Sequence, residues 1–206
     1  MDYADFIEGF ASSPLVQYAQ QLPWALTSQS EQIVLSLLTD SQSDFSVAED
    51  IAVHRSAQIE AGAVLKGPLI IGPRCFIAAG AYLRGGCWLE ADNIIGPSCE
   101  LKSSFPFRGT KLAHFNFVGD SLIGAHCNFE AGSIVANYRN ERDGADILIN
   151  SPSGQYETGV AKFGVLAGDR VKLGANAVIA PGAILGRGKI VPRLGLVDQW
   201  PQTLRS

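Results

Sequence analysis

Charged residues are scarce in this chain of 206 residues. Asp, Glu, Lys and Arg together make up 17% of it, whereas an average soluble protein has about 25%. Basic residues are also fewer than acidic ones, 16 against 20, which gives a net charge of −4. Because there is no surplus of positive charge, we expect neither a nucleic acid nor an anionic membrane as the main partner.

Targeting signals and redox motifs are also missing. The four cysteines form no Cys-x-x-Cys pair, so they are expected to be free thiols of a cytoplasmic protein. The first residues include Asp2, Asp5 and Glu8 and no apolar run, which is unlike a secretory signal. Prolines interrupt the longest uncharged stretch, 9–30, so no segment is expected to span a bilayer.

An internal repeat of six residues dominates the sequence. Every sixth residue from 53 to 101 is Ile, Leu or Val, and we call these nine positions the aliphatic slots. If half of all residues were apolar, nine apolar residues at such positions would occur by chance about once in 500 trials. Four residues after the slots come mostly small residues, including Cys75, Cys87 and Cys99, which we interpret as compact fillers of a narrow interior. The nine slots hold Val53, Ile59, Leu65, Ile71, Ile77, Leu83, Leu89, Ile95 and Leu101.

This period is typical of a hexapeptide parallel β-helix, in which three hexapeptides form one triangular coil of eighteen residues. We predict an all-β, single-stranded parallel β-helix over 51–192, with the left hand known for hexapeptide proteins. Glycines such as Gly80 and Gly96 are expected at its corners with positive φ. After two interruptions the period is expected to return at Phe117, Ile123, Phe129 and Val135, and then at Ala161, Ala167, Leu173, Ile179, Leu185 and Val191.

The interruptions and the two ends are expected to lie outside the prism. We predict loops at 103–116 and 136–160 and a C-terminal tail at 193–206. Residues 1–50 are predicted to be an α-helical extension. In it, Ser13-Pro14 is typical of a helix start, and Ser28-Gln-Ser-Glu31 has the form of a capping box.

A column of cations is predicted on the outside of the prism. Outward residues eighteen apart stack on adjacent coils, and one such column holds Lys66, Arg84 and Lys102. Two unit charges about 4.8 Å apart repel by about 0.9 kcal/mol in water and about 3.5 kcal/mol at an effective dielectric constant of 20. The column therefore indicates either a bound anion such as phosphate or a solvated face whose long side chains cover apolar surface.

Several polar residues have the types and separations of a known family. The chain resembles the acetyltransferase domain of the bifunctional enzyme that makes UDP-N-acetylglucosamine. The resemblance implies a trimeric left-handed β-helix with active sites where subunits meet, which acetylates the amine of glucosamine-1-phosphate from acetyl-CoA. The matching residues are Arg84, Lys102, His114, Gly119-Asp120, Asn128 and Asn137-Tyr138.

The same resemblance implies a role for each matching position. Arg84 and Lys102 would bind the sugar phosphate, and Asn128 would contact the sugar. His114 would be the general base that takes the proton of the attacking amine, a role that a neutral imidazole suits near pH 7. The acetyl-CoA end would be held by the backbone at Ala131 and the side chains of Asn137 and Tyr138.

The chain departs from the family at three places. Phe117 replaces a tyrosine whose hydroxyl would help to bind the phosphate, and Ala175 replaces a serine that contacts the cofactor. The long second loop leaves Lys162 as the candidate for a further substrate-binding lysine. Asp120 would orient either a loop or the base.

We therefore predict an acyl-CoA-dependent N-acyltransferase, a homotrimer that acts on a phosphorylated or nucleotide-linked amino sugar without a catalytic metal. One alternative is a non-catalytic β-helix scaffold. Another is a metal-dependent hydratase of the γ-carbonic anhydrase type, which needs histidines that converge on a metal. His114 and His126 are expected on different faces of one chain, which disfavours the hydratase.

Overall fold

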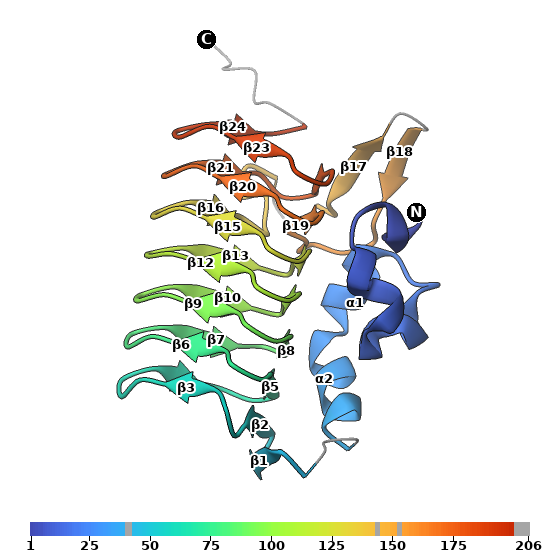
Figure 1. The fold of residues 1–206 in the computed structure, drawn as a ribbon. Coiled ribbons are helices and arrows are strands. Elements are labelled where there is room, and N and C mark those ends of the chain that lie inside the picture. Colours follow the sequence, from blue (N-terminus) through green and yellow to red (C-terminus); the bar gives the residue numbers. More distant parts are fainter. Residues whose placement is uncertain (40–42, 143–144, 152–153, 200–206) are drawn as a thin grey trace.

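Short parallel strands wind into a three-sided coil in the computed structural model, which describes residues 1–39, 43–142, 145–151 and 154–199 (Figure 1). The predicted left-handed parallel β-helix is confirmed. Strands of one face pair in parallel with those one coil above and below.

We number the three faces in chain order. Face 1 contains β2 (Ile51–His54), β5 (Leu69–Ile71), β8 (Cys87–Leu89), β11 (Phe105–Pro106), β14 (Leu122–Ile123), β19 (Val165–Ala167) and β22 (Ala183–Leu185). Face 2 contains β3 (Gln58–Ile59), β6 (Phe76–Ile77), β9 (Ile94–Ile95), β12 (Lys111–Leu112), β15 (Asn128–Phe129), β20 (Lys172–Leu173) and β23 (Ile190–Val191). Face 3 contains β4 (Val64–Leu65), β7 (Tyr82–Arg84), β10 (Glu100–Lys102), β13 (Phe117–Gly119), β16 (Ile134–Val135), β21 (Val178–Ile179) and β24 (Leu196–Val197).

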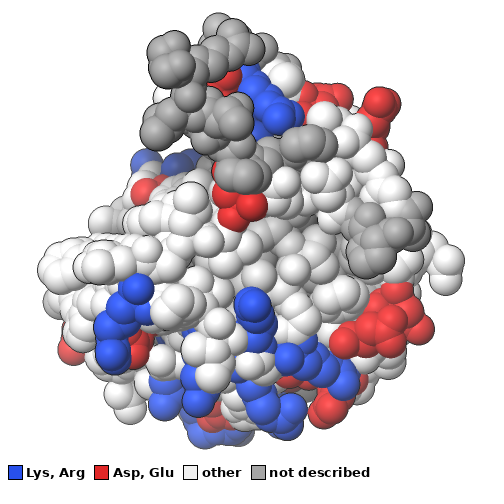
Figure 2. All heavy atoms as spheres, turned by 90° about the horizontal axis from the view of Figure 1, so that it is seen from above, with Lys and Arg blue, Asp and Glu red and all other residues white. Residues whose placement is uncertain are grey.

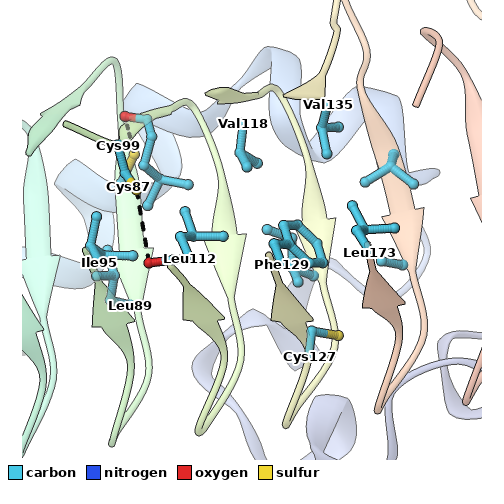
Figure 3. Packing of buried hydrophobic residues seen from close by; sticks show 14 of the residues in the cluster. Cys87, Leu89, Ile95, Cys99, Leu112, Val118, Cys127, Phe129, Val135 and Leu173 are labelled. Atoms are coloured by element: carbon cyan, nitrogen blue, oxygen red, sulfur yellow. Dashed lines mark hydrogen bonds between the residues drawn. The ribbon is translucent and has the colours of Figure 1, made fainter. Parts of the chain in front are cut away.

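The prism interior is filled by the aliphatic slots and the small residues between them. Ile71, Leu83 and Leu101 are fully buried. Cys87 and Cys99 lie in the same interior as Leu89, Ile95 and Leu112 (Figure 3), and both thiols donate hydrogen bonds to backbone carbonyls. The cysteines therefore act as compact fillers, as their spacing predicts.

The predicted loop at 103–116 is wrong, because this segment forms regular coil. Leu83 pairs with Leu101 at a separation of eighteen residues, but Leu101 pairs with Val118 at seventeen. A corner one residue shorter changes the phase of the repeat, which imitates an interruption. The inward slot of β13 is consequently Val118, and the expected slot Phe117 points outward.

A true excursion leaves the prism after β16. It contains the antiparallel hairpin of β17 (Leu148–Ser151) and β18 (Gly154–Glu157). The chain re-enters the coil at β19, where Ala167 pairs with Ile123. Ala161 is exposed and lies outside the coil, so its expected place in the repeat is wrong.

The two ends also differ from the expected boundaries. β24 pairs with β21, so the coil continues to Val197, beyond the expected end at 192. The last part of the expected tail, 200–206, lies outside the described residues. At the other end, β1 (Phe45–Ala48) pairs antiparallel with β2, so strand replaces the expected helix there.

The N-terminal extension consists of short helices. They are η1 (Tyr3–Asp5), η2 (Glu8–Ser12), η3 (Pro14–Tyr18), α1 (Pro23–Ser28) and α2 (Ser30–Leu38). Ser13 caps η3, accepting from the Leu15 amide. The capping box at Ser28 is wrong, because α2 begins at Ser30 and has no side-chain cap.

This extension covers face 1 (Figure 1). The outward side chains of face 1 form an apolar column, Ile70, Trp88, Phe105, Leu122 and Leu166, which is buried against the extension and the excursion. The ring centroids of Trp24 and Phe163 lie 5.9 Å apart. Faces 2 and 3 carry no such cover in the described part of the chain.

Candidate functional site

A pocket of about 490 Å³ opens where face 3 meets the start of the excursion. We call it the corner pocket. Five residues singled out from the sequence line it together with the candidate lysine: Arg84, Lys102, Phe117, Asn137, Tyr138 and Lys162.

The strand register places the two cations of this pocket. Lys102 pairs with Arg84 on adjacent strands, so the stacking predicted from the eighteen-residue coil is confirmed. Each cation also has an acidic partner, which the sequence argument did not include. Arg84 binds Glu100 through Nε at 2.8 Å and Nη2 at 2.6 Å. Lys102 Nζ lies 2.9 and 3.0 Å from the two carboxylate oxygens of Asp120.

Asp120 joins two parts of the pocket. Its carboxylate accepts hydrogen bonds from Lys102 Nζ and from the side-chain amide of Asn137. The side chains of Lys102 and Asp120 are only 16% and 7% exposed, so the ion pair is poorly screened by water. Asp120 has φ +47°, a left-handed conformation that Asp tolerates better than most residues. The carboxylate thus fixes the positions of both partners.

Close packing at Gly119 brings Asn137 and Phe117 over the strand. A Cβ added at Gly119 would lie 2.6 Å from Asn137 Nδ2 and 2.9 Å from Phe117 Cζ. Any side chain at this position would therefore displace one wall of the pocket.

The start of the excursion supplies the remaining wall of the pocket. The last described coil holds this start of the excursion in place. Arg139 is buried, and its Nη2 atom binds the carboxylate of Asp198 at 2.6 Å. Tyr138, the preceding residue, is 38% exposed at the pocket. This ion pair therefore connects the pocket to the C-terminal end of the coil.

His114 lies outside the corner pocket, at the corner between faces 2 and 3. Its carbonyl accepts from the Gly132 amide at 2.9 Å, and the Ala131 carbonyl accepts from Asn176 at 3.0 Å. This ladder places His114, Ala131 and Ala175 above one another on successive coils. The His114 side chain is exposed, with the ring of Phe115 at a centroid distance of 6.5 Å. Phe115 is itself 65% exposed.

Asn128 faces a different hollow. It lines a groove of about 480 Å³ on face 2, which we call the face-2 groove, together with Glu130 and Arg193. Arg193 binds Glu130 through two contacts of 2.9 Å, and this pairing lowers the pKa of the Glu130 carboxyl below its usual value. Within one chain, the candidate residues thus divide into the corner pocket, the His114 corner and the face-2 groove.

Charges on the molecule are mixed in sign. Viewed down the coil, basic and acidic side chains lie side by side along the same edge (Figure 2). Among the described residues, no group of three or more His, Cys, Asp or Glu side chains could hold a metal ion. No helix in the described ranges has the length and apolar character to cross a membrane.

Sequence reasoning missed the bridging role of Asp120, although a signal was present. Asp120 follows Lys102 by eighteen residues, one step further along the cation column. Because this coil is one residue short, Gly119 takes the position above Lys102, and Asp120 turns toward the ammonium group from the corner.

The chain is similar to GlmU-type bifunctional proteins. It is 36% identical over 124 residues to the bifunctional protein GlmU of Methanococcus vannielii, which covers 60% of this chain and 29% of the relative. It is 30% identical over 183 residues to the bifunctional protein GlmU of Methanocaldococcus jannaschii, which covers 86% of this chain and 44% of the relative. The resemblance inferred from the sequence is therefore confirmed, and the chain spans less than half the length of these curated relatives.

A solved structure is also similar. It is the acetyltransferase domain of PglB from Neisseria gonorrhoeae in complex with acetyl coenzyme A, with a TM-score of 0.44 and 14% identity over 87% of this chain and 74% of that one. No protein-family model matches the chain.

Proposed function

We propose, from the homology to GlmU-type proteins, that this chain is an N-acyltransferase that moves the acetyl group of acetyl-CoA to the amine of a phosphorylated or nucleotide-linked amino sugar such as glucosamine-1-phosphate. The observation that carries the proposal is the corner pocket. It gathers Arg84, Lys102, the adjacent Asn137 and Tyr138, and Lys162 from four places in the sequence.

The acceptor phosphate binds at Arg84 and Lys102. Charge-assisted hydrogen bonds from two cations on adjacent strands suit an anion with several oxygens. Glu100 and Asp120 keep both side chains extended toward the pocket before the acceptor arrives. Lys162 is a third cation at the rim, while Phe117 presents a ring without a hydroxyl. Position 117 therefore supplies no hydrogen bond to the phosphate, and the cations are its main partners.

His114 acts as the general base, and Asn128 contacts the sugar. These residues face the surface away from the corner pocket, so the complete site needs more than one copy of the chain. Face 1 is buried under the N-terminal extension, which leaves faces 2 and 3 and their shared corner for contacts between copies. We propose a homotrimer in which these faces meet, so that His114 and Asn128 of one chain complete the corner pocket of a neighbour.

Acetyl-CoA is held by residues at both corners of face 3. Asn137 and Tyr138 lie at the corner pocket, while Ala131 and Ala175 stack with His114 at the other corner. Ala175 has no hydroxyl, so its position offers backbone and van der Waals contacts only. Ala131 and Ala175 leave a strip of small side chains next to His114 on the following coils, which suits an extended thioester chain.

The test is release of free thiol from acetyl-CoA in the presence of amino-sugar acceptors. The His114→Ala variant is expected to lose 10²–10⁴-fold in rate, as removal of a general base requires, while its oligomeric state is unchanged. His126→Ala, a change of another exposed histidine, is the matched control. Equal turnover of His114→Ala and the unchanged protein would remove the proposed base. Absence of thiol release and of CoA binding in the unchanged protein would instead support a scaffold.

A further inference from the structure

The cation column continues one coil beyond the corner pocket. Leu65 pairs with Leu83, and the Lys66 amide donates to the Leu83 carbonyl at 2.9 Å. Lys66 therefore lies next to Arg84 as Arg84 lies next to Lys102. The resemblance to GlmU-type proteins assigns roles to Arg84 and Lys102 and none to Lys66.

Lys66 differs from the other two cations in its surroundings. Arg84 and Lys102 each form an ion pair with a carboxylate. In the described part of the chain, the Lys66 ammonium forms no ion pair or side-chain hydrogen bond, and it lies over the ring of Tyr82, 5.2 Å from the centroid. Arg84 lies over the same ring at 5.6 Å. The uncompensated positive charge of the column is therefore at Lys66.

The spacing of the column limits what one anion can bind. Adjacent strands lie about 4.8 Å apart, so Lys66 and Lys102 are separated by about 10 Å at the backbone. A single phosphate held between Arg84 and Lys102 is thus one strand away from Lys66. A second anionic group, joined to the first and extending along the column, would lie beside the third cation.

The order of residues along the column gives a direction. Asn137, the candidate residue for the acyl end, contacts Asp120 beside Lys102, and Lys66 is at the opposite end of the column. A group attached to the acceptor phosphate can extend along the column in the direction away from Asn137. In that direction it passes Arg84 and reaches Lys66.

We infer that Lys66 binds the second phosphate of a nucleoside-diphosphate-linked amino sugar. This inference rests on the proposed function and narrows its acceptor from phosphorylated amino sugars in general to the diphosphate-linked class.

The first test is binding of inorganic pyrophosphate and inorganic phosphate to the full chain, measured by calorimetry, which requires no turnover. Pyrophosphate is expected to bind about tenfold more tightly than phosphate, because a hydrogen bond to a charged group adds a contact that phosphate cannot reach. Lys66→Met should remove this difference without changing phosphate affinity. Lys189→Met, a change of an exposed lysine at the corner between faces 1 and 2, should leave both affinities unchanged.

The second test compares KM for a UDP-linked amino sugar and for the corresponding sugar-1-phosphate. Lys66→Met should raise KM about tenfold for the UDP-linked acceptor alone. Equal pyrophosphate and phosphate affinities in the unchanged protein, or an equal rise of both KM values in the variant, would overturn the assignment of Lys66. Failure of every amino sugar as an acceptor would instead overturn the proposed function, and the pyrophosphate measurement would still decide whether Lys66 binds a second phosphate.

Discussion

At the scale of single residues, the corner pocket depends on Asp120 and Gly119. Asp120 forms a buried ion pair with Lys102 and a hydrogen bond with Asn137. Gly119 permits Asn137 and Phe117 to pack directly on β13. One residue thus sets the charges of the pocket and the other sets its shape.

Replacing Asp120 with Asn should affect both substrates. The variant leaves Lys102 without its carboxylate, which in a buried pair costs about 3 kcal/mol of unfolding free energy, and it releases Asn137. We expect KM to rise for acetyl-CoA and to change for the acceptor, whereas Glu100→Gln should change only the acceptor KM. Urea unfolding and steady-state kinetics measure the two effects. A loss of stability with both KM values unchanged would show that Asp120 is structural only.

Replacing Gly119 with Ala should displace Asn137. The added Cβ would lie 2.6 Å from its amide nitrogen, closer than van der Waals contact allows. We expect at least a tenfold loss of kcat/KM, about 1.4 kcal/mol of transition-state stabilisation. Gly186→Ala is the matched control, because a Cβ there meets nothing within 4 Å. Kinetics indistinguishable from those of Gly186→Ala would contradict the assigned packing.

At the scale of elements, the N-terminal extension and face 1 form a second core outside the prism. Trp88 points outward from β8 yet is only 6% exposed, and its ring centroid lies 5.4 Å from that of Phe107. Arg187 ties the extension to a corner through the carbonyls of Ala4 and Phe6, at 2.6 and 3.1 Å. The extension is therefore part of the folded unit.

Trp88→Ala should lower the free energy of unfolding by about 3–5 kcal/mol, as large-to-small changes in a core do. The control is Val64→Ala on face 3, where the side chain is 47% exposed and the expected loss is below about 1 kcal/mol. Urea unfolding compares the two variants. Equally small losses of unfolding free energy in the two variants would mean that the packing of the extension on face 1 does not stabilise the fold.

The element scale also shows what sequence reasoning can reach. A six-residue period is a strong signal because every strand places one aliphatic side chain inward, so the coil and the stack of Arg84 on Lys102 were predictable. A corner shortened by one residue leaves the inward side chains in place but reduces the number of residues between successive inward positions. The six-residue period is then lost in the sequence, which is why 103–116 was expected to be a loop. Gly80 has the expected positive φ of +76°. Gly96 does not have a positive φ, and it is needed because a Cβ would overlap the Ala113 carbonyl.

Contacts between distant segments were beyond the pattern. The bridge from Asp120 to Asn137 joins two coils through side chains, and the cover on face 1 brings the extension and the excursion onto the outward side chains of that face. The sequence marks one side of each contact, through the position of Asp120 one repeat after Lys102 and through the apolar outward column of face 1, but it does not identify the segment that makes the contact. The division of the candidate residues among two corners and face 2 likewise follows from the coil geometry and not from their order along the chain.

At the scale of the whole molecule, the prism interior contains four buried thiols. Burial raises the pKa of Cys75, Cys87 and Cys127 to about 12, and it also raises the pKa of Cys99. A raised pKa means that the folded state favours the protonated thiol. The stabilisation is complete below the pKa of an unfolded thiol, about 8.5, and is lost as pH rises toward 12.

We therefore expect the free energy of unfolding to fall above pH 8.5, by about 1 kcal/mol for each of Cys75, Cys87 and Cys127 by pH 9.5. Urea unfolding at pH 7.5 and pH 9.5 measures this change. Cys87→Ala removes one titrating group and should reduce the loss between the two pH values by about 1 kcal/mol. An identical pH dependence in the variant would contradict the buried position of this thiol.

The central claim is that Arg84 and Lys102, stacked by the coil, hold the phosphate of an amino sugar while its amine is acetylated. The most direct measurement is kcat/KM for acetyl transfer to phosphorylated amino sugars and to glucosamine itself, in the unchanged protein and in Arg84→Met. We expect Arg84→Met to lose about 10–100-fold for the phosphorylated acceptors alone, which is the value of a charged hydrogen bond. An equal loss for glucosamine would contradict this claim.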